Sequence, residues 1–140
     1  MGRRMQGIGD REEDMMNMLW DCGKAMTSVD LENALSADKW NHAAIFRTIK
    51  SLHAKGMIEE CGTELRGKQW TRKFKPVVTK EEFMAQFLID RGIDTKSLGK
   101  VAAAVVNKSK KSKAEDEKLI KELESIIKII RNRITAFAIH

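Results

Sequence analysis

The stretch Trp40–Gly56, WNHAAIFRTIKSLHAKG, decides the fold predicted for this chain. Ile45, Ile49 and Leu52 follow one another at intervals of four and three residues, which places them on one face of a helix. The opposite face carries small or basic residues. These are Ala43, Arg47, Lys50 and Ala54. A helix with one apolar face and one small, cationic face can pack on a domain and enter the major groove of DNA.

Two further helices are predicted before this stretch. Asp10 and Glu13 resemble a capping box, which begins a first helix that ends at Gly23. Its inward-facing residues are expected to be Met15, Met18, Leu19 and Trp20. Thr27 and Asp30 give a second capping signal and begin a short helix. The third helix then begins after Asn41, a good N-cap residue, and stops at Lys55-Gly56.

After Gly56 the pattern changes to that of short strands. Residues 57–60 and 68–75 are predicted to form a hairpin, joined by the glycine-bearing turn CGTELRG at 61–67. Three helices followed by a hairpin is the order of a winged helix-turn-helix. Residues 65–80 contain six cations and no acid, which fits a phosphate clamp and, about equally well, a solvated surface strand. The cations are Arg66, Lys68, Arg72, Lys73, Lys75 and Lys80.

The C-terminal half is predicted to be helical. Thr79 and Glu82 form a capping box that begins one helix, and an Ala/Val-rich helix follows at 95–107. The last segment has apolar residues at alternating spacings of four and three, a stripe that one isolated helix cannot bury. Preceding helices of the same chain could cover it, but a second subunit is the better candidate. The residues expected to build a dimer are Phe83, Phe87, Leu98, Val101, Leu119, Leu123, Ile126, Ile127 and Ile130.

The predicted fold class is therefore mostly α with a small β-hairpin. We expect a winged helix-turn-helix DNA-binding domain at residues 1–78 and a C-terminal helical dimerisation domain at residues 79–140.

Composition limits the function. The chain has 140 residues and a net charge of +6, which favours an anionic partner, although many ordinary proteins are equally basic. Its two cysteines cannot supply a disulfide framework or a four-ligand metal site. His42 and His53 are about three helical turns apart, too far to share a metal. No nucleophile motif, phosphate loop, targeting signal or membrane-spanning run is present. We expect a soluble cytoplasmic protein with no catalytic residues, metal or cofactor.

Three segments carry a resemblance to a known family. MMNMLWD at 15–21, KWNHAAIFRTIKSLHAKGMIEE at 39–60 and VVTKEEFMAQFLID at 77–90 resemble the BlaI/MecI/CopY family of penicillinase-type repressors. The resemblance covers roughly residues 11–125. It implies a homodimer whose winged helices bind a palindromic DNA operator and whose C-terminal helices interlock. It also implies release by proteolysis, with a sensor protease as a further partner, or by metal binding.

The chain departs from that family at several positions. Ala43 and Ala44 replace a Lys or Ser and a Thr, Phe46 replaces Arg, Lys or Tyr, and Ser51 replaces Arg. We therefore expect an operator unlike the usual family site. The tail ITAFAIH has no cysteine, and the region SLGKVAAAVVNKSKK has no Asn-Phe bond. The resemblance implies release by metal binding at C-terminal Cys-x-Cys motifs in the copper-responsive members and by cleavage of an Asn-Phe bond in the antibiotic-responsive members. We expect neither route in this chain.

The predicted function is a homodimeric, DNA-binding transcriptional repressor without enzymatic activity. The expected DNA contacts are Asn41, His42, Ala43, Phe46, Arg47 and Lys50 in the recognition helix, and Arg66, Lys68 and Arg72 in the wing. Among these, Ala43 and Phe46 would touch thymine methyl groups, although Phe46 could instead pack in the core or at the dimer. An alternative is a protein-interaction module on a winged-helix scaffold with no DNA affinity of its own, which the thin polar face of the helix leaves open.

Overall fold

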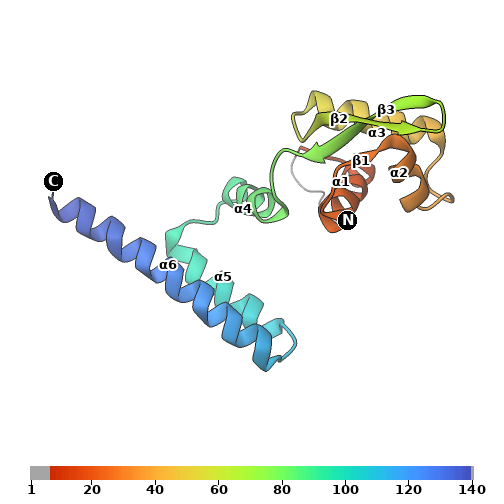
Figure 1. Ribbon diagram of the computed structural model, residues 1–140. Helices are drawn as coiled ribbons and strands as arrows, with labels where there is room; N and C mark the ends of the chain where they lie inside the picture. The colour runs from red at the N-terminus through yellow and green to blue at the C-terminus, as the bar shows by residue number, and fades with distance from the viewer. Residues whose placement is uncertain (1–6, 140) are drawn as a thin grey trace. The chain divides into compact units, whose positions relative to one another are not determined.

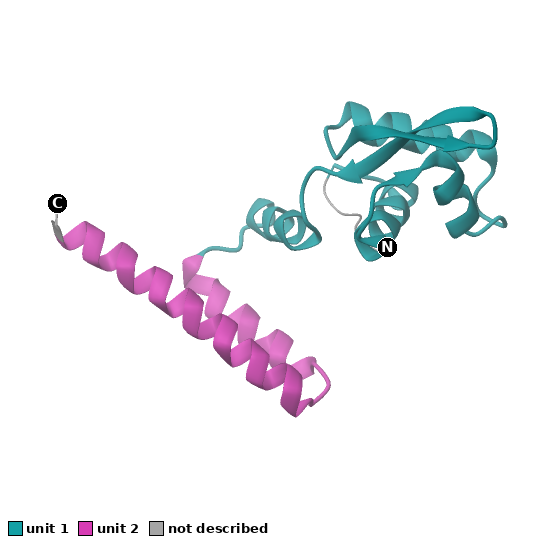
Figure 2. Cartoon of the chain, in the orientation of Figure 1, with its two compact units in different colours: residues 1–94 teal, residues 95–140 magenta. Residues whose placement is uncertain are grey.

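The computed structural model describes residues 7–139 as six helices and one small antiparallel sheet (Figure 1). In chain order these are α1 (Asp10–Cys22), β1 (Met26–Thr27), α2 (Ser28–Ala34), α3 (His42–Ala54), β2 (Ile58–Arg66), β3 (Gln69–Pro76), α4 (Lys80–Asp90), α5 (Thr95–Lys108) and α6 (Lys113–Ile139). The chain divides into two compact units, Met1–Asp94 and Thr95–His140 (Figure 2). The boundary expected at 78–79 precedes this division by one helix, α4.

The core of the first unit lies where α1, α2 and α3 meet the sheet. The apolar face predicted for α3 is confirmed, because Ile45, Ile49 and Leu52 are all buried. Against it pack side chains from α1, α2 and the strands. These are Met15, Met16, Leu19, Met26, Leu31 and Ile58. Met16 is buried in place of the expected Met18, which is half-buried together with Trp20. Since helices alone supply most of this core, the sheet mainly extends outward from it.

Local capping explains where these helices begin and end. Thr27 and Asp30 form the predicted capping box of α2, and Asn41 caps α3 through a 2.7 Å bond to the Ala44 N–H. Gly56 follows α3 at φ 74°, a left-handed conformation that glycine adopts without steric cost. The capping box predicted for α1 was wrong by one residue. Gly9 is its N-cap, and the Glu12 side chain accepts from the Gly9 N–H.

The sheet differs from the prediction in extent. Its strand order is β1-β3-β2, and the two-residue β1 was not predicted because so short a strand leaves no alternation to read. The turn predicted at 61–67 was also wrong, since β2 continues to Arg66. The chain reverses at Gly67-Lys68, with Gly67 at φ 63°, as a two-residue hairpin turn requires. β2 lacks the usual alternation of apolar and polar residues for two reasons. A bulge lies between Glu60 and Gly62, and most of the strand is exposed on both faces.

The helix α4, which belongs to the first unit, contacts α1 of the same unit. Thr79 and Glu82 form the predicted capping box at its start. The indole Nε1 of Trp20 donates to the Val78 carbonyl oxygen at 3.0 Å, and the Trp20 ring lies 5.8 Å from that of Phe83. Trp20 on α1 thus fixes both the approach to α4 and one side chain on it.

The second unit consists of α5 and α6. Both predicted helices are confirmed, and only residues 109–112 lie between them. Their apolar side chains are mostly exposed, including those of Leu98, Ile126 and Ile130. No helix within residues 7–139 is both long enough and apolar enough to cross a membrane.

Candidate nucleic-acid interface

The outer face of α3 combines small and cationic side chains. Ala43, Arg47 and Lys50 are exposed, as the helical spacing predicted, and α3 contains no acidic residue. Within the described part of the chain, neither Arg47 nor Lys50 forms an ion pair. Both cations are therefore available to an anionic or hydrogen-bonding partner in the unbound protein.

The first turn of α3 carries three more of the predicted contacts. The side-chain oxygen of Asn41 is occupied by the N-cap bond, which leaves its amide N–H groups for DNA. His42 Nδ1 lies 3.2 Å from Oε2 of Glu32 on α2. Phe46 is 48 % exposed, so it is not a core residue, and its ring meets that of His42 edge-on. No sequence signal indicated Glu32, because the fold alone brings α2 to the start of α3.

A hydrogen-bond network around Glu12 holds the C-terminal end of α3. The Glu12 carboxylate accepts from Lys55 Nζ at 2.8 Å and from Ser51 Oγ at 3.1 Å. Partial burial acts to raise the pKa of Glu12, but hydrogen bonds from Lys55, the Gly9 N–H and Ser51 outweigh it, so its pKa lies below the ordinary value. Ser51 therefore faces α1 rather than the outer face of α3, and its departure from the family pattern leaves that outer face unchanged.

In the wing, Arg66 is held by carboxylates. Its Nη1 lies 2.8 Å from Asp30 Oδ1 on α2 and 3.2 Å from Glu64 Oε2. A hydrogen bond from the Thr27 backbone N–H is the main cause of a lowered pKa at Asp30; burial opposes it, and the Arg66 charge adds to it. Arg66 thus joins the wing to α2 in the unbound protein.

The cations of β3 also meet acids, contrary to the impression of an acid-free hairpin. Residues 65–80 contain no acid, but β2 lies opposite and supplies them. Arg72 Nε lies 3.3 Å from Glu60 Oε1, and Lys75 Nζ lies 3.4 Å from Glu59 Oε1. Of the three predicted wing contacts, only Lys68 has no ion pair among residues 7–139. Lys68 sits in the exposed turn of the hairpin, where a phosphate can reach it.

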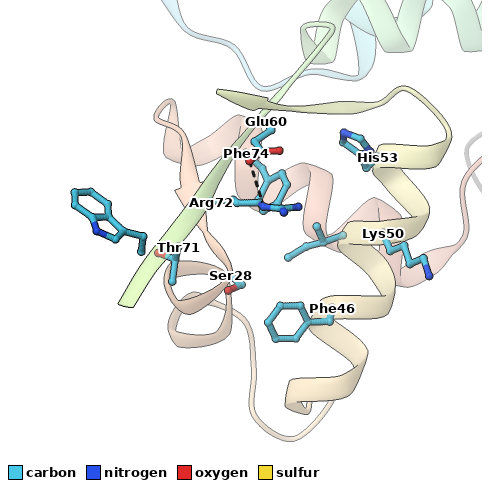
Figure 3. Close-up of a pocket in the computed structure, with 10 residues that line it drawn as sticks. Ser28, Phe46, Lys50, His53, Glu60, Thr71, Arg72 and Phe74 are labelled. Atoms are coloured by element: carbon cyan, nitrogen blue, oxygen red, sulfur yellow. Dashed lines mark ion pairs between the residues drawn. The ribbon is translucent and has the colours of Figure 1, made fainter. Parts of the chain in front are cut away.

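A groove of about 600 Å³ separates α3 from the hairpin. Figure 3 shows Phe46 on the α3 side and Arg72 on the β3 side, with the contact between Arg72 and Glu60 dashed. Trp70, which also lines the groove, is 68 % exposed, and its cross-strand neighbour Leu65 is 52 % exposed. No sequence pattern pointed to Trp70, because large apolar residues in strands are ordinarily packed.

The predicted dimerisation residues fall into two groups. Phe83 packs against Trp20 of its own chain, and Phe87 stacks under the Arg91 guanidinium at 4.7 Å, so both are half-buried in the first unit. The others lie in α5 and α6, where Leu119 is half-buried and the rest are exposed. These are Leu98, Val101, Leu123, Ile126, Ile127 and Ile130. Only this second group presents an uncovered apolar surface.

Among the described residues no group of three or more His, Cys, Asp or Glu side chains could hold a metal ion. Cys22 and Cys61 are both free thiols on the surface.

Comparisons with known proteins agree with this architecture. Residues 8–129 match the family model described as penicillinase repressor. No curated protein sequence matches the chain. Among solved structures, a MepR mutant from a multidrug-resistant S. aureus clinical isolate is 13% identical, with a TM-score of 0.50 and coverage of 88% of this chain and 79% of that one. That likeness concerns the fold alone.

Two other structures are more distant in shape. Adhesin competence repressor (AdcR) from Streptococcus pyogenes is 16% identical, with a TM-score of 0.45, and covers 92% of this chain and 85% of its own. An S. aureus MepR mutant bound to an oligodeoxyribonucleotide is 13% identical, with a TM-score of 0.47, and the match covers 88% of this chain and 80% of that one. The family match, which spans most of the chain, carries the assignment: the chain belongs to the penicillinase repressor family, a family of DNA-binding transcriptional repressors.

Proposed function

We propose that this protein is a sequence-specific transcriptional repressor that binds a palindromic DNA operator as a homodimer. The observation that carries the proposal is the outer face of α3, which is free of acids and on which Arg47 and Lys50 form no ion pair among residues 7–139. An unpaired guanidinium and ammonium on one helix face attract phosphates and donate hydrogen bonds to base edges.

Each exposed side chain of α3 suits a particular contact. Arg47 can donate two parallel hydrogen bonds to O6 and N7 of guanine, and Lys50 can donate to the same atoms or to a phosphate. Ala43 brings the backbone of α3 close to the groove and can touch a thymine methyl group. Lys68, in the turn of the wing, is the predicted wing contact best placed to bind a phosphate, because no carboxylate among residues 7–139 pairs with its ammonium.

The dimer follows from the unequal lengths of α5 and α6. α5 has 14 residues and α6 has 27, so they are about 21 Å and about 40 Å long. α5 is therefore too short to cover α6 along its whole length. Ile130, Ile134 and Phe137 lie toward the C-terminal end of α6 and are exposed by 46%, 63% and 80%. A second copy of the chain can cover such a stripe, as in a helical bundle.

A palindromic operator is the expected consequence of that dimer. Homodimers with one interface are related by a two-fold axis, and each subunit then presents the same α3 to one half-site. A repressor of this kind acts by occupying the operator.

One observation favours a second candidate, a winged-helix module that binds another protein. Phe46, Leu65 and Trp70 leave large apolar side chains exposed beside the groove, and two wing arginines are already paired. Exposed aromatic residues are common anchors of protein interfaces. Arg47 and Lys50 of α3, which form no ion pair within the described part of the chain, favour DNA, because a protein partner would need acidic side chains to pair with them.

Selection from a randomised duplex library tests the proposal. The full chain should enrich a sequence with two inverted half-sites. Binding to it should weaken as salt rises, because the protein releases counterions from the phosphates and that release becomes less favourable at high salt. Failure to enrich any sequence, or binding that is insensitive to salt, would favour the protein-interaction module instead.

A further inference from the structure

We propose that Glu32 is a positioning residue that holds the imidazole of His42 so that Nε2 reads a base edge in the operator. The inference rests on the proposed function, because it assigns a specificity-determining group within the same DNA-binding surface. Neither the amino-acid order nor the family match indicates this pair.

Two contacts fix the His42 ring. On one side Nδ1 lies 3.2 Å from Oε2 of Glu32, which comes from α2, ten residues earlier. On the other side the ring meets Phe46, one turn further along α3, at a centroid distance of 4.7 Å and an angle of 67°. Such edge-to-face packing is a favoured arrangement of two rings. The imidazole is thus restrained in direction although its side chain is 72% exposed.

The Glu32 contact also selects where the proton sits. An ionised carboxylate is only an acceptor, so it requires a proton on His42 Nδ1. In the neutral imidazole the second nitrogen, Nε2, then carries a lone pair and can only accept. Acceptors on a protein match the two donors of the major groove, the N6 amino group of adenine and the N4 amino group of cytosine. His42 would therefore favour an adenine or a cytosine at the position that Nε2 faces, over a guanine or a thymine there.

The place of His42 in the helix fits this role. It is the first residue of α3, directly after the N-cap Asn41. In helix-turn-helix proteins the N-terminal residues of the recognition helix contact base edges. The contact with Glu32 contributes little to stability, because both side chains are exposed and polar contacts at the surface are generally weak. Its consequence is orientation, which a measurement of base preference detects and a measurement of unfolding does not.

Base preference in the full chain tests the inference. Duplexes enriched by the wild type are changed one base pair at a time, and affinities are measured at about pH 8, where an ordinary imidazole is neutral. The variants are His42→Ala, Glu32→Ala, Glu32→Gln and the double Ala variant. Asp38→Ala serves as the control, because it removes an exposed acid from the turn between α2 and α3 without touching His42.

The expected result is a preference of about tenfold at one base pair per half-site that His42→Ala and Glu32→Ala both abolish. The double variant should lose no more than either single one. Glu32→Gln, whose amide oxygen still accepts from Nδ1, should restore the preference, and Asp38→Ala should keep it.

Three results would overturn the inference. If the preference survives in Glu32→Ala, Glu32 does not position the reading group, whatever His42→Ala does, although the proposed function stands. If Glu32→Ala abolishes it and His42→Ala does not, then Glu32 reads the base itself. If the wild type enriches no sequence at all, both the inference and the proposed function fail.

Discussion

Arg66 at the end of β2 and Asp30 in the first turn of α2 form an ion pair with 2.8 Å between Nη1 and Oδ1. The pair fastens the wing to the helix that precedes the recognition helix. It also means that the guanidinium of Arg66, which the sequence suggested as a phosphate contact, is already neutralised in the unbound protein.

Replacement of Arg66 should therefore act on stability more than on DNA binding. Arg66→Ala is expected to lower the free energy of unfolding by up to about 1 kcal/mol, the range of partly exposed ion pairs, and to leave the salt dependence of DNA affinity unchanged. Urea unfolding and fluorescence anisotropy on an enriched duplex measure the two effects. A flatter salt dependence with unchanged stability would show that Arg66 leaves Asp30 for a phosphate.

Lys68 is expected to behave in the opposite way. Because its ammonium has no ion-pair partner among residues 7–139, Lys68→Ala should weaken binding to all duplexes alike. The slope of log affinity against log salt should become shallower by about one unit per subunit in contact. Arg66→Ala, two residues away, is the matched control. An unchanged slope in Lys68→Ala would remove the wing turn from the interface.

Acid should destabilise the first unit through Asp30 and Glu12. The pKa of each carboxyl is lowered by folding, so each contributes stability that is present above its ordinary range and lost as pH falls through the folded pKa. The free energy of unfolding should thus be flat near neutral pH and decline below about pH 4. Glu12→Gln should show a shallower decline in a urea titration repeated at each pH. An equally steep decline in that variant would contradict the network around Glu12.

The apolar stripe of α6 should hold the dimer. Ile126→Asp places a charge within the stripe, whereas Ser125→Asp places the same charge about 100° further around the helix, at a polar position outside the stripe. Ile126→Asp is expected to weaken dimerisation at least about tenfold by analytical ultracentrifugation, and Ser125→Asp to leave it intact. Equal behaviour of the two variants, with helicity retained, would place the dimer interface elsewhere.

Local signals predicted much of this fold. The caps at Thr27, Asn41 and Thr79 and the glycine after α3 depend on a few neighbouring residues, and the structure confirms them. The two-residue β1 has no such signal, because it exists only through pairing with β3. The wing was predicted too short for a related reason. A hairpin that projects into solvent has both faces exposed, so its strands show no alternation of apolar and polar residues.

The candidate site was predictable only in part. The spacing in α3 identified Ala43, Arg47 and Lys50 as an exposed face, since helical periodicity is a local property. The partners of Arg66 and Arg72 were not foreseen, because they depend on strand register and on where α2 lies. Glu32 was missed for the same reason. Composition counts charges, but only the fold determines which charges remain unpaired.

The most direct test of the account compares Arg47→Ala with the wild type on an enriched duplex and on random duplexes of equal length. Arg47 lies exposed on the outer face of α3 and forms no ion pair with any described residue, so its loss should reduce affinity for the enriched duplex by about tenfold or more, through lost base contacts, and affect random duplexes far less. Lys68→Ala, measured alongside, should weaken both equally. An equal loss on enriched and random DNA for Arg47→Ala would contradict the claim that α3 reads the operator sequence.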